Sequence, residues 1–449
     1  MSSAGSVVPT NRAEPAQPLA DAGQAMWQLA ADLFPICRSI TGEGLRATLR
    51  QLQRYIPLEL YEVPSGTPVF DWVVPKEWNI RDAYVKNGRG ERVVDFQRSN
   101  LHVVNYSIPV HGTFTMPDLL PHLHSLPEQP EWIPYRTSYY SEQWGFCLSH
   151  NQLRALSDDS YEVQIDASLT AGSLSYGECY LPGECQDEIL ISCHTCHPSL
   201  ANDNLSGVVV ATFLAQSLLT RPRHYSYRFI FIPGTIGAIT WLCLNEAHIG
   251  RIQHGLVLAG VGDAGTTTYK RSRRGDTPID RAFAYLLQHS GQPFSIQDFS
   301  PYGYDERQYC SPAFNLPVGT LMRTPFGQYP QYHTSGDNLD FIRPASLHDT
   351  LAKCQAAFDL LEHDRYYLNQ NPKCEPQLGK RGLYGPLGGQ SDTQLSQLAR
   401  LWVLNLSDGQ HALLDIAERA RVPFDLIQAA AMELLGAGLL VEQSRPVAA

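Results

Sequence analysis

The stretch that most constrains the fold is residues 189–207, which read ILISCHTCHPSLANDNLSG. Its opening apolar run, residues 189–191, is typical of a parallel strand that is buried on both faces. The residues after Gly207, VVVATFLAQSLL, predict a helix that packs back on that strand. The polar residues between the two elements therefore lie at the carboxyl end of a strand, where open α/β sheets place their ligand sites.

The polar part of this stretch carries residue types that bind metals. His194 and His197 follow the strand, and Asp203 comes six residues after His197. Imidazole and carboxylate groups together suit Zn²⁺. A polar turn with hydrogen-bonded histidines is the alternative, and a His-x-x-His pair alone would favour it. Asp203, together with the distant His333, favours a metal site.

The composition limits the classes of protein that remain. A chain of 449 residues is too long to fold around one ordinary hydrophobic core, so we expect two or three domains. The formal net charge of −11 argues against broad binding to a phosphate backbone. The first twenty residues show no signal peptide, and no apolar run is long enough to span a membrane. Together with ten cysteines at irregular spacings, these features predict a cytoplasmic protein that has no membrane partner.

The chain divides into segments of different character. Aromatic residues, prolines and glycines are dense in one early segment, where short β-type runs predict a small all-β insert or lid. Strand and helix patterns alternate on both sides of it, which predicts an α/β fold with a mostly parallel sheet. The predicted boundaries are a disordered tail at 1–20, the α/β domain at 21–62 and 149–370, the β insert at 63–148, a linker at 371–390 and a last domain at 391–445.

Residues 301–342 form a second informative block, rich in tyrosine, proline and glycine and therefore dominated by loops. Polar groups on long loops are more often functional than structural. Near the amino terminus, Arg38 opens the turn RSITGEG, where it could line a site or belong to a plain helix-capping turn. Candidate substrate-binding residues are Arg38, Arg323 and Tyr332. Among its polar residues the block carries Asp305, Glu306, Arg307, Arg323, His333 and Asp337.

Several motifs resemble known proteins. DNLSG after a strand-end histidine, and YHTSGDNLDFI near the end of the α/β domain, look like the zinc-dependent exopeptidase fold. That group includes bacterial leucyl aminopeptidases and glutaminyl cyclases. RSITGEG, CHPSLANDNLSG, GTIGAI and GYDERQYCSP, taken with YHTSGDNLDFI, more closely resemble a bacterial family from about residue 25 to 440. The family implies a three-layer aminopeptidase-like domain with an inserted β domain and a C-terminal winged helix, near polysaccharide or natural-product biosynthesis.

The resemblance assigns roles residue by residue. Asp203 matches the aspartate of the metal-site DN motif, and His333 matches the histidine of the HT motif. The first histidine is ambiguous, because His194 sits where the strand-end ligand would fall and His197 belongs to the CHP signature. We predict His197, Asp203 and His333 as ligands, with His194 as the alternate or as a residue behind the ligands. Asp305 resembles a late aspartate that lies beside the metal.

The departures from the resemblance are equally informative. Peptidases of this fold carry a pair of glutamates before a Gly-rich turn, and here that position reads Gly234-Thr235. The next expected metal aspartate falls in residues 258–260, which read LAG. We therefore predict one zinc ion rather than two, with three protein ligands and an open fourth position. Glu306 or Asp305 could act as a replacement general base, if a dry pocket raises its pKa. A structural salt bridge to Arg307 or Arg323 is the alternative for both.

The last segment, DGQHALLDIAERARVPFDLIQAAAMELLGAGLLVE, reads as helix, turn, helix and short strand, which is a winged-helix pattern. Its second helix, residues 424–435, contains no Lys or Arg. DNA binding is therefore not expected, and a structural role or a role in forming a homo-oligomer is favoured.

Three functional classes follow. The first, and the favoured one, is a zinc-dependent aminopeptidase-like amidohydrolase that acts on a small peptide or an aminoacyl conjugate. The second is a single-zinc cyclase of the glutaminyl-cyclase type. The third is a non-catalytic binding or regulatory protein on a peptidase scaffold. Bound metal beside a carboxylate would favour the first two classes, and a site blocked by the β insert would favour the third.

Overall fold

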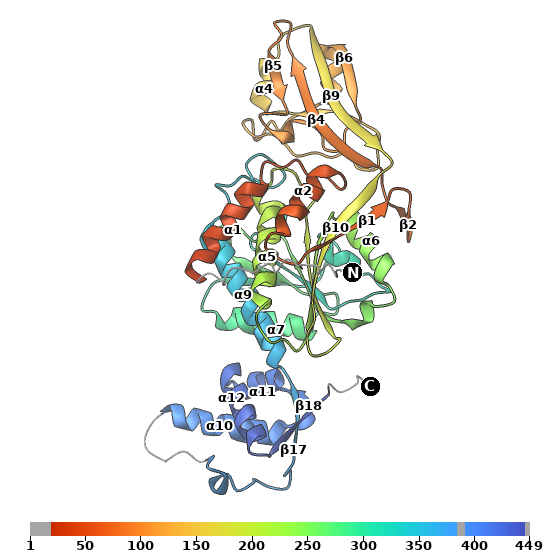
Figure 1. Cartoon of the computed structure of the whole chain (residues 1–449). Coiled ribbons are helices and arrows are strands. Elements are labelled where there is room, and N and C mark those ends of the chain that lie inside the picture. The colour runs from red at the N-terminus through yellow and green to blue at the C-terminus, as the bar shows by residue number, and fades with distance from the viewer. Residues whose placement is uncertain (1–18, 384–390, 445–449) are drawn as a thin grey trace, which may run out of the picture.

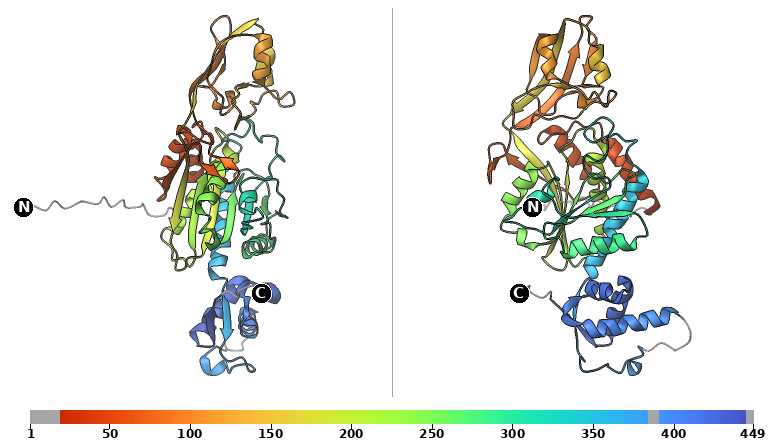
Figure 2. Two further views of the ribbon diagram at one scale, coloured as in Figure 1. Left: turned by 90° about the vertical axis from the view of Figure 1, so that its right-hand side faces the viewer. Right: turned by 180° about the vertical axis from the view of Figure 1, so that it is seen from behind.

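The computed structural model describes residues 19–383 and 391–444. The tail predicted at residues 1–20 lies outside the described residues except for its last two, and so does part of the predicted linker, residues 384–390. Three parts follow one another along the long axis of the molecule (Figures 1 and 2). They are a four-stranded β part at one end, an α/β part in the middle and a small helical part at the other end.

A mixed eight-stranded sheet forms the centre of the α/β part, in the order β1-β10-β12-β11-β13-β16-β14-β15. Its middle strand β11 (Glu188–His194) is buried along all seven residues and runs parallel to both neighbours, β12 (Ser226–Ile232) and β13 (Ile252–Leu258). The predicted α/β fold with a large central sheet is confirmed. The outer strands are β1 (Glu59–Pro64), β10 (Ser173–Leu181), β16 (Val318–Met322), β14 (Thr267–Lys270) and β15 (Phe294–Gln297).

Helices cover both faces of this sheet because alternate residues of β11 point to opposite sides. Ile189 and Ile191 belong to one apolar core, and Leu190 belongs to the other. A strand buried on both faces needs such a continuous apolar run. The first core takes in α1 (Leu19–Leu33), α2 (Glu43–Leu52), α5 (Gly207–Leu218), α7 (Pro278–His289) and α9 (Pro344–His363), and the second takes in α6 (Ile236–Asn245) and α8 (Glu306–Tyr309).

The start of α5 lies unusually close to the end of β13. A side chain at Gly207 would collide with the carbonyl oxygen of Leu258, so only glycine allows this approach. The turn that precedes Gly207, residues 201–206, is thereby brought to the carboxyl edge of the sheet, where β11 also ends.

The β part is an antiparallel sheet in the order β5-β4-β9-β6. Its strand β9 lies beyond residue 148, the predicted end of the insert, and pairs with both β4 and β6. The strands of this sheet are β4 (Glu77–Lys86), β5 (Arg92–Asp95), β6 (Val110–Thr115) and β9 (Ser160–Thr170). Smaller elements around it are β2 (Pro68–Val69), β3 (Trp72–Val73), β7 (Leu123–His124), β8 (Phe146–Cys147), α3 (Met116–Leu119) and α4 (His150–Ala155).

The C-terminal part combines three helices with a three-stranded sheet in the order β18-β17-β19. The strand β17 precedes residue 371, so this sheet begins before the predicted linker. Arg281 of α7 forms ion pairs with Asp415 and Glu418, at 2.7 and 2.5 Å, which attach this part to the α/β part. The elements are β17 (Tyr366–Asn369), α10 (Ser391–Leu406), β18 (Asp408–Ala412), α11 (Leu413–Ala420), α12 (Phe424–Gly436) and β19 (Leu440–Gln443).

Two further features are the absence of a membrane-spanning helix among the described residues and the state of the cysteines. Within residues 19–383 and 391–444, no helix is both long enough and apolar enough to cross a membrane. All ten cysteines are free thiols.

We expect no useful DNA binding by the C-terminal part. Its helix α12 contains no Lys or Arg and carries Asp425 and Glu433, so it offers no positive charge to a phosphate backbone. Fluorescence anisotropy of a labelled generic duplex at low salt should stay flat up to micromolar protein. Binding that weakens as salt is raised would contradict this expectation.

Candidate metal centre

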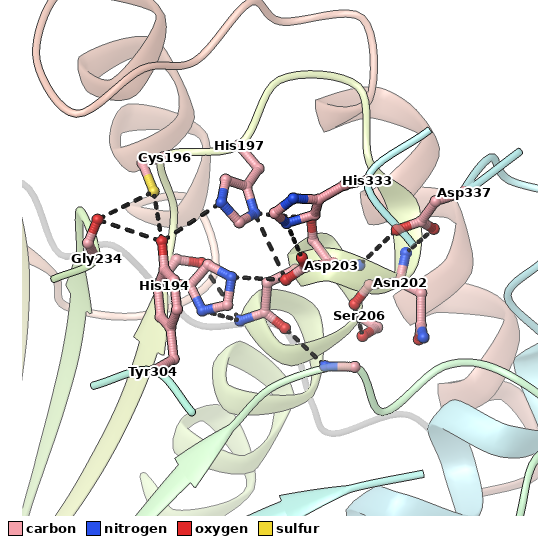
Figure 3. Close-up of polar contacts among 12 residues, drawn as sticks. His194, Cys196, His197, Asn202, Asp203, Ser206, Gly234, Tyr304, His333 and Asp337 are labelled. Carbon is pink, nitrogen blue, oxygen red and sulfur yellow. Dashed lines mark hydrogen bonds and ion pairs between the residues drawn. The ribbon is translucent and has the colours of Figure 1, made fainter. Parts of the chain in front are cut away.

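Four side chains with metal-binding chemistry meet at the carboxyl edge of the sheet (Figure 3). His194 is the last residue of β11, and His197 lies in the loop that follows. Asp203 sits in the turn that leads into α5. His333 comes from the long loop before α9, and it is brought here across 130 residues of sequence. The structure thus brings together all four residues that we singled out as ligands or alternates.

Asp203 lies at the centre of this group. Its Oδ1 is 2.8 Å from His194 Nε2 and 3.5 Å from His197 Nδ1, and its Oδ2 is 3.0 Å from His333 Nε2. Donor atoms of His194, His197 and Asp203 all lie within 4.8 Å of one another. These three side chains are buried, whereas that of His333 is 34% exposed. The group is therefore open on the side of His333.

The charge state of these donors suits a zinc ion. Burial lowers the pKa of His194 to about 4, although its hydrogen bond to Asp203 works in the other direction. The imidazole is therefore neutral near pH 7, as a ligand must be. Burial opposes ionisation of Asp203, but the nearby imidazoles of His197, His194 and His333 outweigh it and hold its pKa well below the usual range. A neutral His194 imidazole beside the ionised carboxylate of Asp203 fits a Zn²⁺ site.

Asp203 is held in place by hydrogen bonds of its backbone and of its neighbours. The carboxylate of Asp337 accepts hydrogen bonds from the backbone N–H groups of Asn202 at 2.6 Å and Asp203 at 2.9 Å. The side-chain amide of Asn204 donates to the carbonyl oxygen of Leu258 at 2.9 Å and accepts from Gly260 N at 3.2 Å. We did not predict these roles, although Asn202 and Asn204 flank Asp203 directly in the sequence.

The β part supplies one wall of the centre. Tyr135 N donates to the carbonyl oxygen of His333 at 2.8 Å, and the Tyr135 ring meets His197 and His333 edge-on at 5.1 and 5.2 Å. This contact supports an unusual backbone, because His333 has a φ of 54°, in the left-handed region that non-glycine residues rarely adopt. No local sequence pattern predicts that Tyr135, which lies nearly two hundred residues from His333, touches it.

Tyr304 occupies the space beside Gly234, where we noted the missing glutamates. A side chain at Gly234 would collide with the Tyr304 ring. The Tyr304 hydroxyl lies 3.4 Å from His197 Nε2 and 3.4 Å from Cys196 Sγ, and it donates to the carbonyl oxygen of Gly234 at 3.2 Å. Because the ring fills this volume, no carboxylate from position 234 could reach the centre. The sequence analysis did not predict this contact.

The two predicted catalytic carboxylates share no hydrogen bond with the four donors in the described part of the chain. Glu306 Oε1 accepts from Lys270 Nζ at 2.8 Å, and its Oε2 accepts from Tyr304 N at 2.9 Å. Its ion-pair partner is therefore Lys270, and neither Arg307 nor Arg323 takes that place. Asp305 is fully buried, and among the described residues neither of its oxygens has a hydrogen-bond partner. Burial, and then the charge of Glu306, raises the pKa of Asp305 to about 8.

The candidate substrate-binding residues fall in different places. Arg38 is buried and donates through Nε to the carbonyl oxygen of His197 at 2.8 Å, so it braces the loop that carries this histidine. Tyr332 stacks on His333, with ring centroids 4.0 Å apart. Arg323 instead binds Asp349 at 2.7 Å and the carbonyl oxygen of Gly265. Its role in binding substrate has no support from these contacts.

The Lys270–Glu306 pair generates a test, because both side chains are at most 4% exposed. Glu306→Gln should lower the free energy of unfolding by about 3–5 kcal/mol, since it leaves the Lys270 charge buried without a partner. Urea denaturation measures the change. The double variant Lys270→Met/Glu306→Gln removes both charges, and it should recover much of the loss. Wild-type stability of Glu306→Gln alone would contradict this interpretation.

The sequence matches known families along most of its length. Residues 27–364 match the family described as Domain of unknown function (DUF4910), and residues 365–442 match a winged helix-turn-helix family. The chain belongs to the DUF4910 family. The second match confirms the winged helix predicted for the C-terminal part.

Relatives agree with this assignment. A Clostridium acetobutylicum protein, named for polysaccharide biosynthesis and for an aminopeptidase-like domain, is 52% identical over 94% of this chain and 96% of its own length. A crystal structure from the same organism, provisionally named as a peptidase, matches with a TM-score of 0.89 and 49% identity over 95% of this chain and 98% of that one.

More distant structures share the fold. A zinc aminopeptidase from Bacillus subtilis, BSAP, matches with a TM-score of 0.54 and 13% identity over 77% of this chain and 95% of that one. At this identity the match shows the fold alone. The predicted aminopeptidase-like architecture is therefore confirmed.

Proposed function

We propose that the chain is a zinc-dependent amidohydrolase of aminopeptidase type that cleaves a small peptide or an aminoacyl conjugate. The observation that carries the proposal is the ionised carboxylate of Asp203 among three imidazoles, at the carboxyl edge of an aminopeptidase-like sheet. The name of the Clostridium acetobutylicum relative supports a place in polysaccharide biosynthesis.

The chain's own part in this reaction is to hold the donors rigid and partly dry. A zinc ion bound there would polarise a substrate carbonyl and lower the pKa of a water molecule. Asp337 fixes the backbone of Asp203, the Tyr304 ring lies 4.0 Å from that of His194, and Tyr135 covers His197. Because only His333 is substantially exposed among the four donors, substrate approaches past this residue.

A catalytic zinc ion takes three protein ligands and keeps its fourth position open, but four candidate side chains surround this site. We assign His197, Asp203 and His333 as the ligands, in keeping with their motifs. His194 then orients Asp203 through the 2.8 Å hydrogen bond. The alternative set replaces His333 by His194, which belongs to the compact buried group with His197 and Asp203.

Zinc analysis of variants separates the two ligand sets. His333→Ala should abolish stoichiometric zinc, whereas His194→Ala should keep it with an affinity weaker by roughly 10–100-fold, the usual effect of losing a group that orients a ligand. Elemental analysis and competition with a zinc chelator measure both values. His111→Ala, an exposed histidine on β6, is the control. The opposite result would exchange the two roles, and full zinc in both variants would refute the site.

A carboxyl group at the start of α8 is the proposed proton acceptor. Glu306 is engaged by Lys270, so we favour Asp305, whose pKa of about 8 suits proton transfer near neutral pH. Asp305→Asn should keep zinc and lower turnover by roughly two to four orders of magnitude. Wild-type turnover would rule Asp305 out.

Stability against pH supplies the control for this variant. A carboxyl whose pKa is raised on folding binds its proton more tightly in the folded state, so its contribution to stability falls as pH rises from about 4 toward 8. Asp305→Asn cannot ionise. The melting temperature of the variant, relative to that of the wild type, should therefore rise between pH 5 and pH 8. A constant difference would show that Asp305 ionises normally.

A panel of aminoacyl coumarin amides tests the reaction itself. Fluorophore release that stops with a chelator and returns with zinc would support hydrolysis. The glutaminyl substrate needs mass spectrometry as well, because a pyroglutamyl product would indicate cyclisation. A zinc-loaded protein without turnover on any substrate would favour a binding role.

A further inference from the structure

An exposed aromatic cluster lies where the β part meets the α/β part. The hairpin formed by β2 and β3 carries Phe70 and Trp72, which are 49% and 44% exposed, and Tyr140 beside it is 52% exposed. The rings of Trp72 and Tyr140 are 5.3 Å apart. Large aromatic rings gathered on the surface of a protein commonly mark a binding site.

The conformation of the hairpin turn does not require an aromatic residue at Phe70. Phe70 stands in the turn between β2 and β3 with a φ of 55°, a conformation that glycine or asparagine adopts at less cost. Its ring reaches Phe314 of the α/β part at 5.7 Å. A tight turn would be more stable with a small residue here, so the turn alone does not explain a large aromatic side chain at this position.

Successive contacts connect this cluster to the candidate metal centre. Tyr140 meets Tyr139 at 6.5 Å between ring centroids, and the Tyr139 hydroxyl lies 3.1 Å from that of Tyr135. Tyr135 in turn touches His197 and His333. A succession of ring contacts therefore connects Trp72 at the surface to the donors around Asp203.

We propose that Trp72 and Tyr140 bind a saccharide portion of the substrate, so that the chain acts on an aminoacyl group joined to a sugar. The inference rests on the proposed hydrolase function. Flat aromatic faces suit the apolar faces of sugar rings, and the exposed polar residues Asp71, Lys76 and Glu142 lie in the same two segments, where they can serve hydroxyl groups. Lys76 and Glu142 pair with each other at 2.6 Å, which leaves no strong net charge for an ionic ligand.

The test uses the full-length chain on an array of neutral and acidic oligosaccharides, together with an array of short peptides. The wild type should bind neutral oligosaccharides. Trp72→Ala and Tyr140→Ala should each weaken that binding roughly tenfold, as expected for the loss of a stacking ring. Trp72→Phe, which keeps an aromatic face, should stay close to the wild type. Phe294→Ala is the matched control, because Phe294 is 38% exposed on β15, at the opposite edge of the sheet from β1.

The design separates this inference from the function on which it rests. Binding is measured on chelator-treated protein and on Asp203→Asn, so it does not depend on turnover. Saccharide binding in these samples, together with a zinc-loaded wild type that hydrolyses none of the aminoacyl amides, would overturn the hydrolase and keep the saccharide site. The saccharide site would be overturned, whatever the turnover, if the wild type bound no saccharide or bound peptides alone. Unchanged saccharide binding by Trp72→Ala and Tyr140→Ala would overturn it equally.

Discussion

The burial of the Asp203 carboxylate is the constraint on which the rest of the site depends. An ionised carboxylate that is 2% exposed needs partners, and here three imidazoles surround it. Leaving a buried charge without its partners costs several kcal/mol, so the conformation of the loop after β11 and that of the His333 loop are linked through one residue. The same arrangement of imidazole nitrogens around one carboxylate suits a zinc ion. The side chains that offset this buried charge are therefore the same ones that we propose as zinc ligands or as the alternate ligand.

Two tyrosines, one from the β part and one from the α/β part, close the site on two sides. Tyr135 supports His333 in its left-handed conformation and closes one side of the donors, and Tyr304 closes another by filling the volume beside Gly234. This filling leaves no room for a side chain at position 234, close to where the resemblance places the glutamates. The filled volume supports the proposal of one zinc ion rather than two.

Local patterns predicted much of the fold and of the donor set. The apolar run of β11 with polar residues at its end located the centre, and motif resemblance added His333, because both signals are written in short stretches of sequence. Contacts between distant segments could not be predicted in this way. Neither Tyr135 beside His333 nor Lys270 beside Glu306 leaves a local signature, and the strands β9 and β17 pair across the predicted domain boundaries. Those boundaries remain predictions, as do the catalytic roles of Asp305 and Glu306.

The claim that one zinc ion is held by nitrogen and oxygen donors is tested most directly by X-ray absorption at the zinc edge of the loaded protein. The account predicts a first shell at about 2.0–2.1 Å with the outer scattering of imidazole rings. A sulfur scatterer at about 2.3 Å, which would place the Cys196 thiolate in the shell, would contradict it. A second zinc at about 3.5–4 Å would contradict it equally, because the volume beside Gly234 would then hold ligands rather than the Tyr304 ring.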